Sequence, residues 1–170
     1  TQNPLDLVGT YPLPTPQLDR FLFKISMDHI DREAELEVLD SIKERKRLLG
    51  NQNKVNRDDV LKARETIFTQ INIDQAIKTT LVDISTNLRQ DERVLQGNST
   101  RSMVLLLPAL QVRAAIRGRS YVSSEDIENL IPEVLNHRIE LVPGVSDFDK
   151  VLQDNMERPL EELAKSTLTK

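Results

Sequence analysis

The residues best suited to chemistry in this sequence are two arginines and one asparagine, each beside a structural boundary. Arg20 follows a loop with three prolines in residues 12–16 and directly precedes the apolar run Phe21-Leu22-Phe23. Each proline removes a backbone donor and restrains the residue before it, whereas the apolar run is typical of a short strand buried on both faces. Asp19 and Arg20 therefore form a charge pair at the mouth of a strand, where it can clamp the structure or direct a cation at a ligand.

Arg101 stands at the start of an apolar helical segment. The helix dipole opposes a cation there by about 0.3 to 1 kcal/mol, and positions that break a stability rule are enriched in functional sites. A guanidinium at a helix N-terminus suits a phosphate, although Arg101 can equally be an exposed arginine with an acidic neighbour. Asn3, in an Asn-Pro pair, is either a turn residue or an amide beside a phosphate. The residue types alone favour the structural interpretation of both positions.

Several kinds of site are excluded by what the sequence lacks. Its five glycines fit neither a G-x-x-x-x-G-K loop nor a G-x-G-x-x-G fingerprint, so the chain has no phosphate-cradling loop of its own. There is no Cys, and His29 and His137 have no partners at ligand spacing, so no metal site is expected. No Ser/His/Asp constellation is recognisable either. The sequence therefore predicts, at most, part of a nucleotide site.

Length and composition set the class of protein. The 170 residues suffice for one domain, or for a small domain with a piece of another. With 38% hydrophobic, 29% charged and only 4% aromatic residues, we expect a soluble, mostly helical protein. No stretch approaches the roughly 20 apolar residues of a membrane span, and the absence of Cys is compatible with a reducing cytoplasm. Because the chain begins at Thr1 without Met, we expect it to be a piece of a longer protein.

The charge balance bears on possible partners. A net charge of −4 argues against a dedicated nucleic-acid binder, although three arginines offer a small basic face. Those residues are Arg113, Arg117 and Arg119.

Hydrophobic periodicity and capping residues predict five helices. The first has acidic residues early and basic residues late, which complements the helix dipole. The second and third are amphipathic and expected in the core, with Asn56 and Asp74 as N-caps. The fourth is apolar on every side over 103–107 and should be central and buried. The fifth begins with a capping box of Ser123 and Asp126. The predicted ranges are about 31–49, 56–71, 74–88, 99–117 and 123–135.

Two further expectations concern prolines. Pro108 removes the hydrogen bond to the carbonyl of Val104, so we expect the fourth helix to bend there. Residues 145–170 are polar and predict a weakly packed tail with one short helix near 159–165.

Four motifs, taken in order, carry a family resemblance. TQNP, GTYPLPTPQLDRFLFK, GNSTRS and GRSYVSSEDI with VLNHRI resemble the C-terminal half of the MoxR-type AAA+ ATPases, relatives of the magnesium-chelatase ATPase subunits. The resemblance covers about residues 1 to 142. It implies a mainly α fold, in which the edge of an α/β AAA+ core with one or two short strands precedes an all-α lid of about five helices. The implied parts are core 1–28, lid 29–142 and tail 143–170.

The resemblance also implies roles for single residues. Asn3 would be sensor 1, oriented toward the γ-phosphate and the attacking water, and Arg20 would be the arginine finger that reaches a neighbouring subunit's nucleotide. Arg101 would be sensor 2 on the lid. Two positions depart from the family pattern: Thr100 stands where a proline usually precedes sensor 2, and Pro108 interrupts the lid helix.

The function implied by the resemblance belongs to a full-length parent. That parent would be a cytoplasmic, hexameric ATPase that uses ATP with Mg²⁺ for chaperone-like remodelling of protein clients. Von Willebrand factor A domain proteins would be possible partners. With its Walker A and B motifs upstream, the present chain should bind no cofactor and hydrolyse no ATP alone. The alternatives are a non-enzymatic helical interaction module, which docks a partner through its amphipathic helices and acidic tail, and a helical DNA-binding domain.

Overall fold

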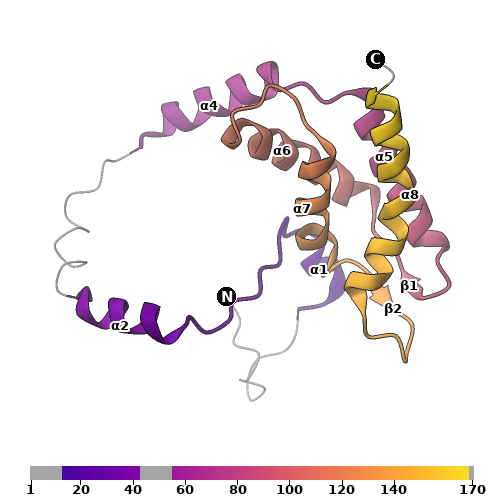
Figure 1. Cartoon of the computed structure of the whole chain (residues 1–170), viewed down its shortest axis with the longest axis horizontal. Coiled ribbons are helices and arrows are strands. Elements are labelled where there is room, and N and C mark those ends of the chain that lie inside the picture. Colours follow the sequence, from indigo (N-terminus) through magenta and orange to yellow (C-terminus); the bar gives the residue numbers. More distant parts are fainter. Residues whose placement is uncertain (1–12, 43–54, 169–170) are drawn as a thin grey trace. The chain divides into compact units, whose positions relative to one another are not determined.

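The computed structural model describes residues 13–42 and 55–168, and these are mainly helical (Figure 1). The mainly α class predicted from the sequence is confirmed. The two short strands that the structure describes form a small ribbon among the later helices, and residues 13–28 contain no strand, while residues 1–12 lie outside the described part of the chain. In chain order the elements are α1 (Thr15–Leu18), α2 (Arg32–Asp40), α4 (Arg57–Gln70), α5 (Gln75–Gln90), β1 (Val94–Gln96), α6 (Thr100–Ile116), α7 (Ser124–Leu135), β2 (Glu140–Leu141) and α8 (Phe148–Leu168).

The chain divides into two compact units. Residues 25–66 form one unit, and the residues up to 24 together with those from 67 onward form the other. The larger unit contains the hydrophobic core, and the charged clusters described below all lie in it.

The core is built from one face each of α5, α6, α7 and α8. Along α5 the buried apolar residues recur at spacings of four, three and four, which keeps them on one side of a 3.6-residue helix. α7 shows the same pattern, and α8 lies alongside α5 (Figure 1). Fully buried branched side chains at the centre are Ile84, Leu88, Leu106, Leu110, Ile127, Ile131 and Leu135.

Helix α8 corrects the expectation of a weakly packed tail. It extends over 21 residues rather than a short stretch near 159–165. Val151, Leu152, Met156 and Leu163 bury one face of it in the core. Pro159 lies inside this helix and not at its first position, which is why its proline misled the sequence interpretation.

Helix α6 is predicted to be the central, buried helix, but the structure buries only one row of its residues. Ser102, Leu106, Leu110 and Ala114 form a buried row at a spacing of four, whereas Val104 is 60% exposed. The helix is continuous across Pro108. The proline therefore does not end the helix, and the bend expected there stays a prediction.

Helix α4 confirms its predicted N-cap, Asn56, but not its predicted burial, and α2 is capped in the same way by Asp31. Asp31 accepts a hydrogen bond from the backbone N–H of Ala34 (2.8 Å), and Asn56 accepts one from Asp59 (2.9 Å). Neither helix contains a buried residue, so α4 is not a core helix within the part of the chain that the structure describes. The predicted continuation of the first helix to residue 49 lies partly outside the described residues.

The connection from α5 to α6 forms a two-stranded ribbon and a close turn. β1 pairs antiparallel with β2, with Val94 opposite Leu141. At Gly97 a Cβ atom would stand 2.7 Å from Cγ of Arg89 and 3.3 Å from its Cα. The side chain of Arg89 crosses the turn and donates from Nε to the carbonyl of Asn98 (3.0 Å). The end of α5 is thereby fixed to the start of α6.

Candidate functional site

Arg20 lies in a turn just after α1. Its backbone N–H donates to the carbonyl of Gln17 (3.2 Å), and that of Phe21 donates to Leu18 (3.0 Å). The Arg20 side chain is exposed, and among the described residues nothing pairs with its guanidinium. An exposed arginine without a partner is free to meet a ligand from outside.

The apolar run after Arg20 is not the buried strand that its sequence predicts. Phe21 is 57% exposed and Phe23 is 37% exposed, and neither belongs to a strand. A strand needs a neighbour for its backbone groups, and within the described part of the chain this segment instead contacts α7. The N–H of Lys24 donates to the carbonyl of Glu133 (3.2 Å), while Leu22 packs against the core.

Arg138, three residues beyond the end of α7, holds this segment in place. Its side chain is only 1% exposed. Nε donates to Oδ1 of Asp19 (3.0 Å), Nη1 to the carbonyl of Leu22 (3.0 Å), and Nη2 to the carbonyl of Asp19 (3.1 Å). Nη1 also donates to the carbonyl of Val134 and Nη2 to that of Phe21. A single guanidinium thus connects the Arg20 segment to the end of α7.

His137 adds a second contact to the same segment. Its Nε2 lies 2.9 Å from the carbonyl of Phe21, so this nitrogen carries the proton and donates. Burial lowers the pKa of His137 below its ordinary value, and the nearby cations of Arg138 and Lys24 act in the same direction. The imidazole is therefore held neutral in the fold.

Asp19 connects the Arg20 segment to the start of α6. Its carboxylate, 23% exposed, accepts from Arg138 and lies within 3.5 Å of the hydroxyls of Ser99 and Ser102. Nη1 of Arg101 stands 4.0 Å from Oδ2 of Asp19, and the Arg101 side chain is 62% exposed. An exposed pair at that distance contributes little stability. Arg101 is accordingly available for another anion.

The structure describes two of the three predicted site residues. Arg20 and Arg101 are brought to the same region, since Asp19 adjoins the first and faces the second. Asn3 lies outside the described residues. Sequence reasoning missed Arg138 and weighed His137 only as a metal ligand. Both stand in the VLNHRI motif, and that motif was the available signal.

A second charged cluster surrounds Asp126, whose side chain is fully buried. Its carboxylate accepts two hydrogen bonds from Arg119 (2.6 and 2.8 Å) and one from the N–H of Ser123 (2.9 Å), and the latter confirms the predicted capping box. Nε of Arg113 lies 3.2 Å away. Burial acts to raise the pKa of Asp126, but the bonds from Arg119 and Ser123 outweigh it and lower that pKa overall. Two of the three arginines of the predicted basic face are thus engaged with an anion.

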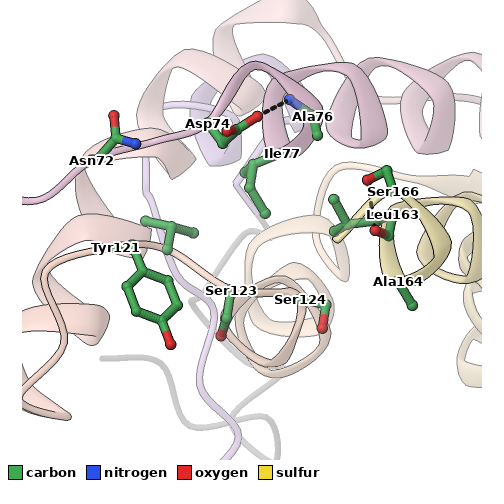
Figure 2. Close-up of a pocket in the computed structure, with 11 residues that line it drawn as sticks. Asn72, Asp74, Ala76, Ile77, Tyr121, Ser123, Ser124, Leu163, Ala164 and Ser166 are labelled. Atoms are coloured by element: carbon green, nitrogen blue, oxygen red, sulfur yellow. Dashed lines mark hydrogen bonds between the residues drawn. The ribbon is translucent and has the colours of Figure 1, made fainter. Parts of the chain in front are cut away.

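The structure also contains a pocket of about 530 Å³ whose lining includes Ser123 of the Asp126 cluster but none of Arg20, Arg101 and Arg138. It lies between the loops before α5 and α7 and the end of α8, and Figure 2 shows the hydroxyls of Tyr121, Ser123 and Ser124 around it. Asp74 lines the pocket, but its carboxylate caps α5 by accepting from the N–H of Ala76 (2.8 Å). None of the side chains that line it is a cation, so the pocket lacks the charge that a phosphate requires.

Two further features were searched for in the described residues. These contain no group of three or more His, Cys, Asp or Glu side chains that could hold a metal ion. No helix in ranges 13–42 and 55–168 is both long and apolar enough to cross a bilayer.

Comparison with known proteins gives the class first. Residues 86–159 match the AAA lid domain. A crystal structure described as that of a "putative ATPase" from Cytophaga hutchinsonii has the same fold, with a TM-score of 0.77 and 29% identity over 92% of this chain and 51% of that one. The helical bundle with Arg101 and Arg138 is therefore a lid of the AAA+ type.

Two relatives with similar sequences then show which AAA+ proteins this chain resembles. The chain is 39% identical to the uncharacterized protein YeaC of Bacillus subtilis over 148 residues, 84% of this chain and 44% of that protein. It is 32% identical to chaperone MoxR1 of Mycobacterium tuberculosis over 152 residues, 83% of this chain and 39% of MoxR1. The chain is therefore similar to the C-terminal part of MoxR-type AAA+ proteins, and it spans less than half the length of these two relatives.

Proposed function

We propose that this chain is the part of a ring-forming ATPase that supplies two arginines to ATP. Arg20 is the arginine finger and acts on the nucleotide of the neighbouring subunit, while Arg101 is sensor 2 and Asn3 is sensor 1 for the subunit's own nucleotide. The observation that carries the proposal is Arg20: its backbone is held by Arg138, yet its guanidinium is exposed and unpaired among the described residues. A fixed cation of this kind stabilises charge in phosphoryl transfer.

The residues present suit the phosphates of ATP and not the metal. Arginine presents planar donors that match phosphate oxygens, and both Arg20 and Arg101 are exposed. The described residues offer no cluster of metal ligands, so residues elsewhere in the full-length protein would hold Mg²⁺. When bound, Mg²⁺ neutralises the developing charge on the phosphate oxygens.

The wider role follows from the family. We propose that the parent protein couples ATP hydrolysis to chaperone-like remodelling of protein clients in the cytoplasm, with von Willebrand factor A domain proteins as possible partners. The name of the similar M. tuberculosis protein, chaperone MoxR1, supports this direction. In the same proposal residues 1–28 are the trailing edge of the ATPase core, 29–142 the lid, and 143–170 an extension of it.

Steady-state ATP turnover of the full-length protein tests the two arginines. Arg20→Ala should lower kcat by about a thousandfold or more with little change in KM, because the finger acts on the transition state. Arg101→Ala should also weaken ATP binding, by about tenfold, since it removes a charged contact to the phosphate. Arg158→Ala is the matched control, because Arg158 is also an exposed arginine (85%) but lies on α8, where it pairs with Glu162. Turnover unchanged by Arg20→Ala would overturn the proposal.

Mixed rings test whether Arg20 acts in trans. A subunit with Arg20→Ala keeps its own nucleotide site, and a subunit with Arg101→Ala keeps its finger. Mixing the two should restore turnover above either variant alone, because some interfaces then combine an intact site with an intact finger. If Arg20 acted on its own subunit's nucleotide, mixing would give only the average of the two rates.

One observation favours the alternative of a non-enzymatic interaction module. Within the unit of residues 25–66, apolar side chains on α2 and α4 are exposed, among them Leu39 (63%) and Val60 (57%). Such faces can dock a partner helix. A partner bound equally well with and without ATP, by a full-length protein that does not hydrolyse ATP, would favour this alternative.

A further inference from the structure

Arg138 has no role in the proposed reaction, yet it is the most completely bonded side chain near the site. An arginine has five N–H donors. Here all of them have acceptors: the carboxylate of Asp19 and the carbonyls of Asp19, Phe21, Leu22 and Val134. The side chain is 1% exposed, so none of these donors relies on water.

Those acceptors lie on both sides of Arg20 in the chain. Nη2 donates to the carbonyls of Asp19 and Phe21, the residues immediately before and after Arg20 in the chain. Nε fixes the Asp19 side chain and Nη1 fixes the next carbonyl, that of Leu22. The backbone on both sides of Arg20 is therefore attached to one rigid, planar group. The fourth carbonyl, that of Val134, fastens the same group to the last turn of α7.

A purely stabilising role does not require an arginine at this position. Burying a guanidinium costs desolvation, and an apolar side chain of similar volume is often as good for stability. An apolar residue cannot, however, donate hydrogen bonds to three backbone carbonyls, those of Asp19, Phe21 and Leu22, in a segment that has no strand partner among the described residues. A fixed position for Arg20 matters because a displacement of about 1 Å of a catalytic group can cost about a hundredfold in rate.

We propose that Arg138 is the positioning residue of the arginine finger: it holds the main chain on both sides of Arg20, so that the exposed guanidinium is presented to the neighbouring subunit in one geometry. This inference rests on the proposed function of Arg20. Arg138 itself touches no nucleotide in this account. Its effect on the reaction passes entirely through Arg20.

Kinetics of the full-length protein test the inference through Arg138→Lys, which keeps the charge but has only three donors. We expect kcat to fall by roughly ten- to a hundredfold, with the KM for ATP unchanged because the subunit's own site is intact. Arg119→Lys is the matched control: it also weakens a bidentate pair to a carboxylate, that of Asp126, but does not touch the Arg20 segment. It should lower Tm without this fall in kcat.

Two combinations separate positioning from general loss of structure. In the Arg20→Ala background, Arg138→Lys should cause no further fall in kcat, since there is no finger left to position. In rings mixed with Arg101→Ala subunits, Arg138→Lys subunits should regain turnover as Arg20→Ala subunits do. A further fall, a raised KM, or failure to complement where Arg20→Ala succeeds would overturn the inference. If Arg20→Ala itself left turnover unchanged, the proposed function would fall instead.

A spectroscopic measurement covers the case in which Arg138→Lys rings do not assemble. These 170 residues contain no Cys, so Arg20→Cys introduces the only thiol in this stretch, and a nitroxide label there reports local mobility. Arg138→Lys should sharpen the label's spectrum markedly, while Arg119→Lys should not. Equal label mobility with Arg138 and with Lys at that position would overturn the inference.

Discussion

The two charged clusters of this lid bury opposite charges. Around Asp126 the anion is fully buried, and the arginines that meet it, Arg113 and Arg119, are each 19% exposed. Around Arg138 the cation is buried at 1% exposure, and its carboxylate partner, Asp19, is 23% exposed. Both clusters pair aspartate with arginine, but the first buries the carboxylate and the second buries the guanidinium.

The inversion reflects what each buried group must hold. A carboxylate accepts hydrogen bonds, and Asp126 accepts one from the backbone N–H of Ser123, the N-cap residue of α7. A guanidinium donates, and Arg138 donates to three carbonyls of a segment that forms no strand, one of which, that of Phe21, also accepts from His137. The buried anion therefore fixes a helix, and the buried cation fixes an irregular loop. Both arrangements leave the adjacent side chain exposed, but Glu125 beside Asp126 pairs with Arg113 at 3.5 Å, whereas no described residue pairs with the guanidinium of Arg20.

The largest effect expected from this comparison is on stability at Asp126. Asp126→Ala removes a buried carboxylate, leaves two arginines without their partner and deletes one half of the capping box. We expect a loss of about 3 kcal/mol in the free energy of unfolding, measured by urea denaturation. Glu125→Ala is the control, because Glu125 pairs with Arg113 at 3.5 Å but is 59% exposed. A similar loss in both variants would show that burial does not set the value of these pairs.

Asp19→Asn should have an intermediate effect. It keeps the shape of the side chain but leaves the buried cation of Arg138 without a counter-charge, although its carbonyl acceptors remain. We expect a loss of about 1 to 2 kcal/mol in the same measurement. Arg101→Ala, which removes only the exposed partner 4.0 Å away, should change stability by less than about 0.5 kcal/mol. A loss from Asp19→Asn larger than that from Asp126→Ala would contradict the ranking of the two clusters.

The smallest effect is the pH dependence contributed by His137. Because burial lowers its pKa in the fold, the unfolded chain binds more protons between the folded pKa and the ordinary value near 6.5. Stability should therefore be complete above about pH 6.5 and should fall as the pH drops below it. His137→Gln keeps a donor for the Phe21 carbonyl but does not titrate. Tm measured at pH 7.5 and 5.5 should decline less in this variant, and equal declines would refute the assignment.

Local signals predicted those parts of the fold that depend on neighbouring residues. Asp74 and the Ser123–Asp126 pair mark the starts of α5 and α7, and the spacing of apolar residues gives their buried faces. The sequence predicts too short a helix for α8, although the buried residues of α8 keep helical spacing. Pro159 is typical of a helix start, and the charged residues around it are typical of a solvated tail. A packed partner overrode that local preference.

Local sequence signals predicted only part of the candidate site. Arg20 and Arg101 are found from the sequence because Arg20 directly precedes an apolar run and Arg101 stands at a helix N-terminus, where the helix dipole opposes a cation. The group that organises them, Arg138, pairs with Asp19 across 119 residues of sequence. No local period or spacing encodes such a contact, and the strand predicted at 21–23 fails for the same reason, since strand formation depends on a distant neighbour.

The turn at Gly97 has a consequence for which substitutions the lid can tolerate. Gly118 and Gly144 adopt positive φ angles of 71° and 96°, so their requirement is conformational. At Gly97 the requirement is space already occupied by Arg89, whose Cγ would lie 2.7 Å from an added Cβ. A shorter side chain at position 89 would remove the contact with Cγ, but the 3.3 Å approach to Cα of residue 89 comes from the backbone and would remain. The two positions are therefore coupled, and a residue larger than Gly at 97 needs both a change at 89 and a small shift of the backbone.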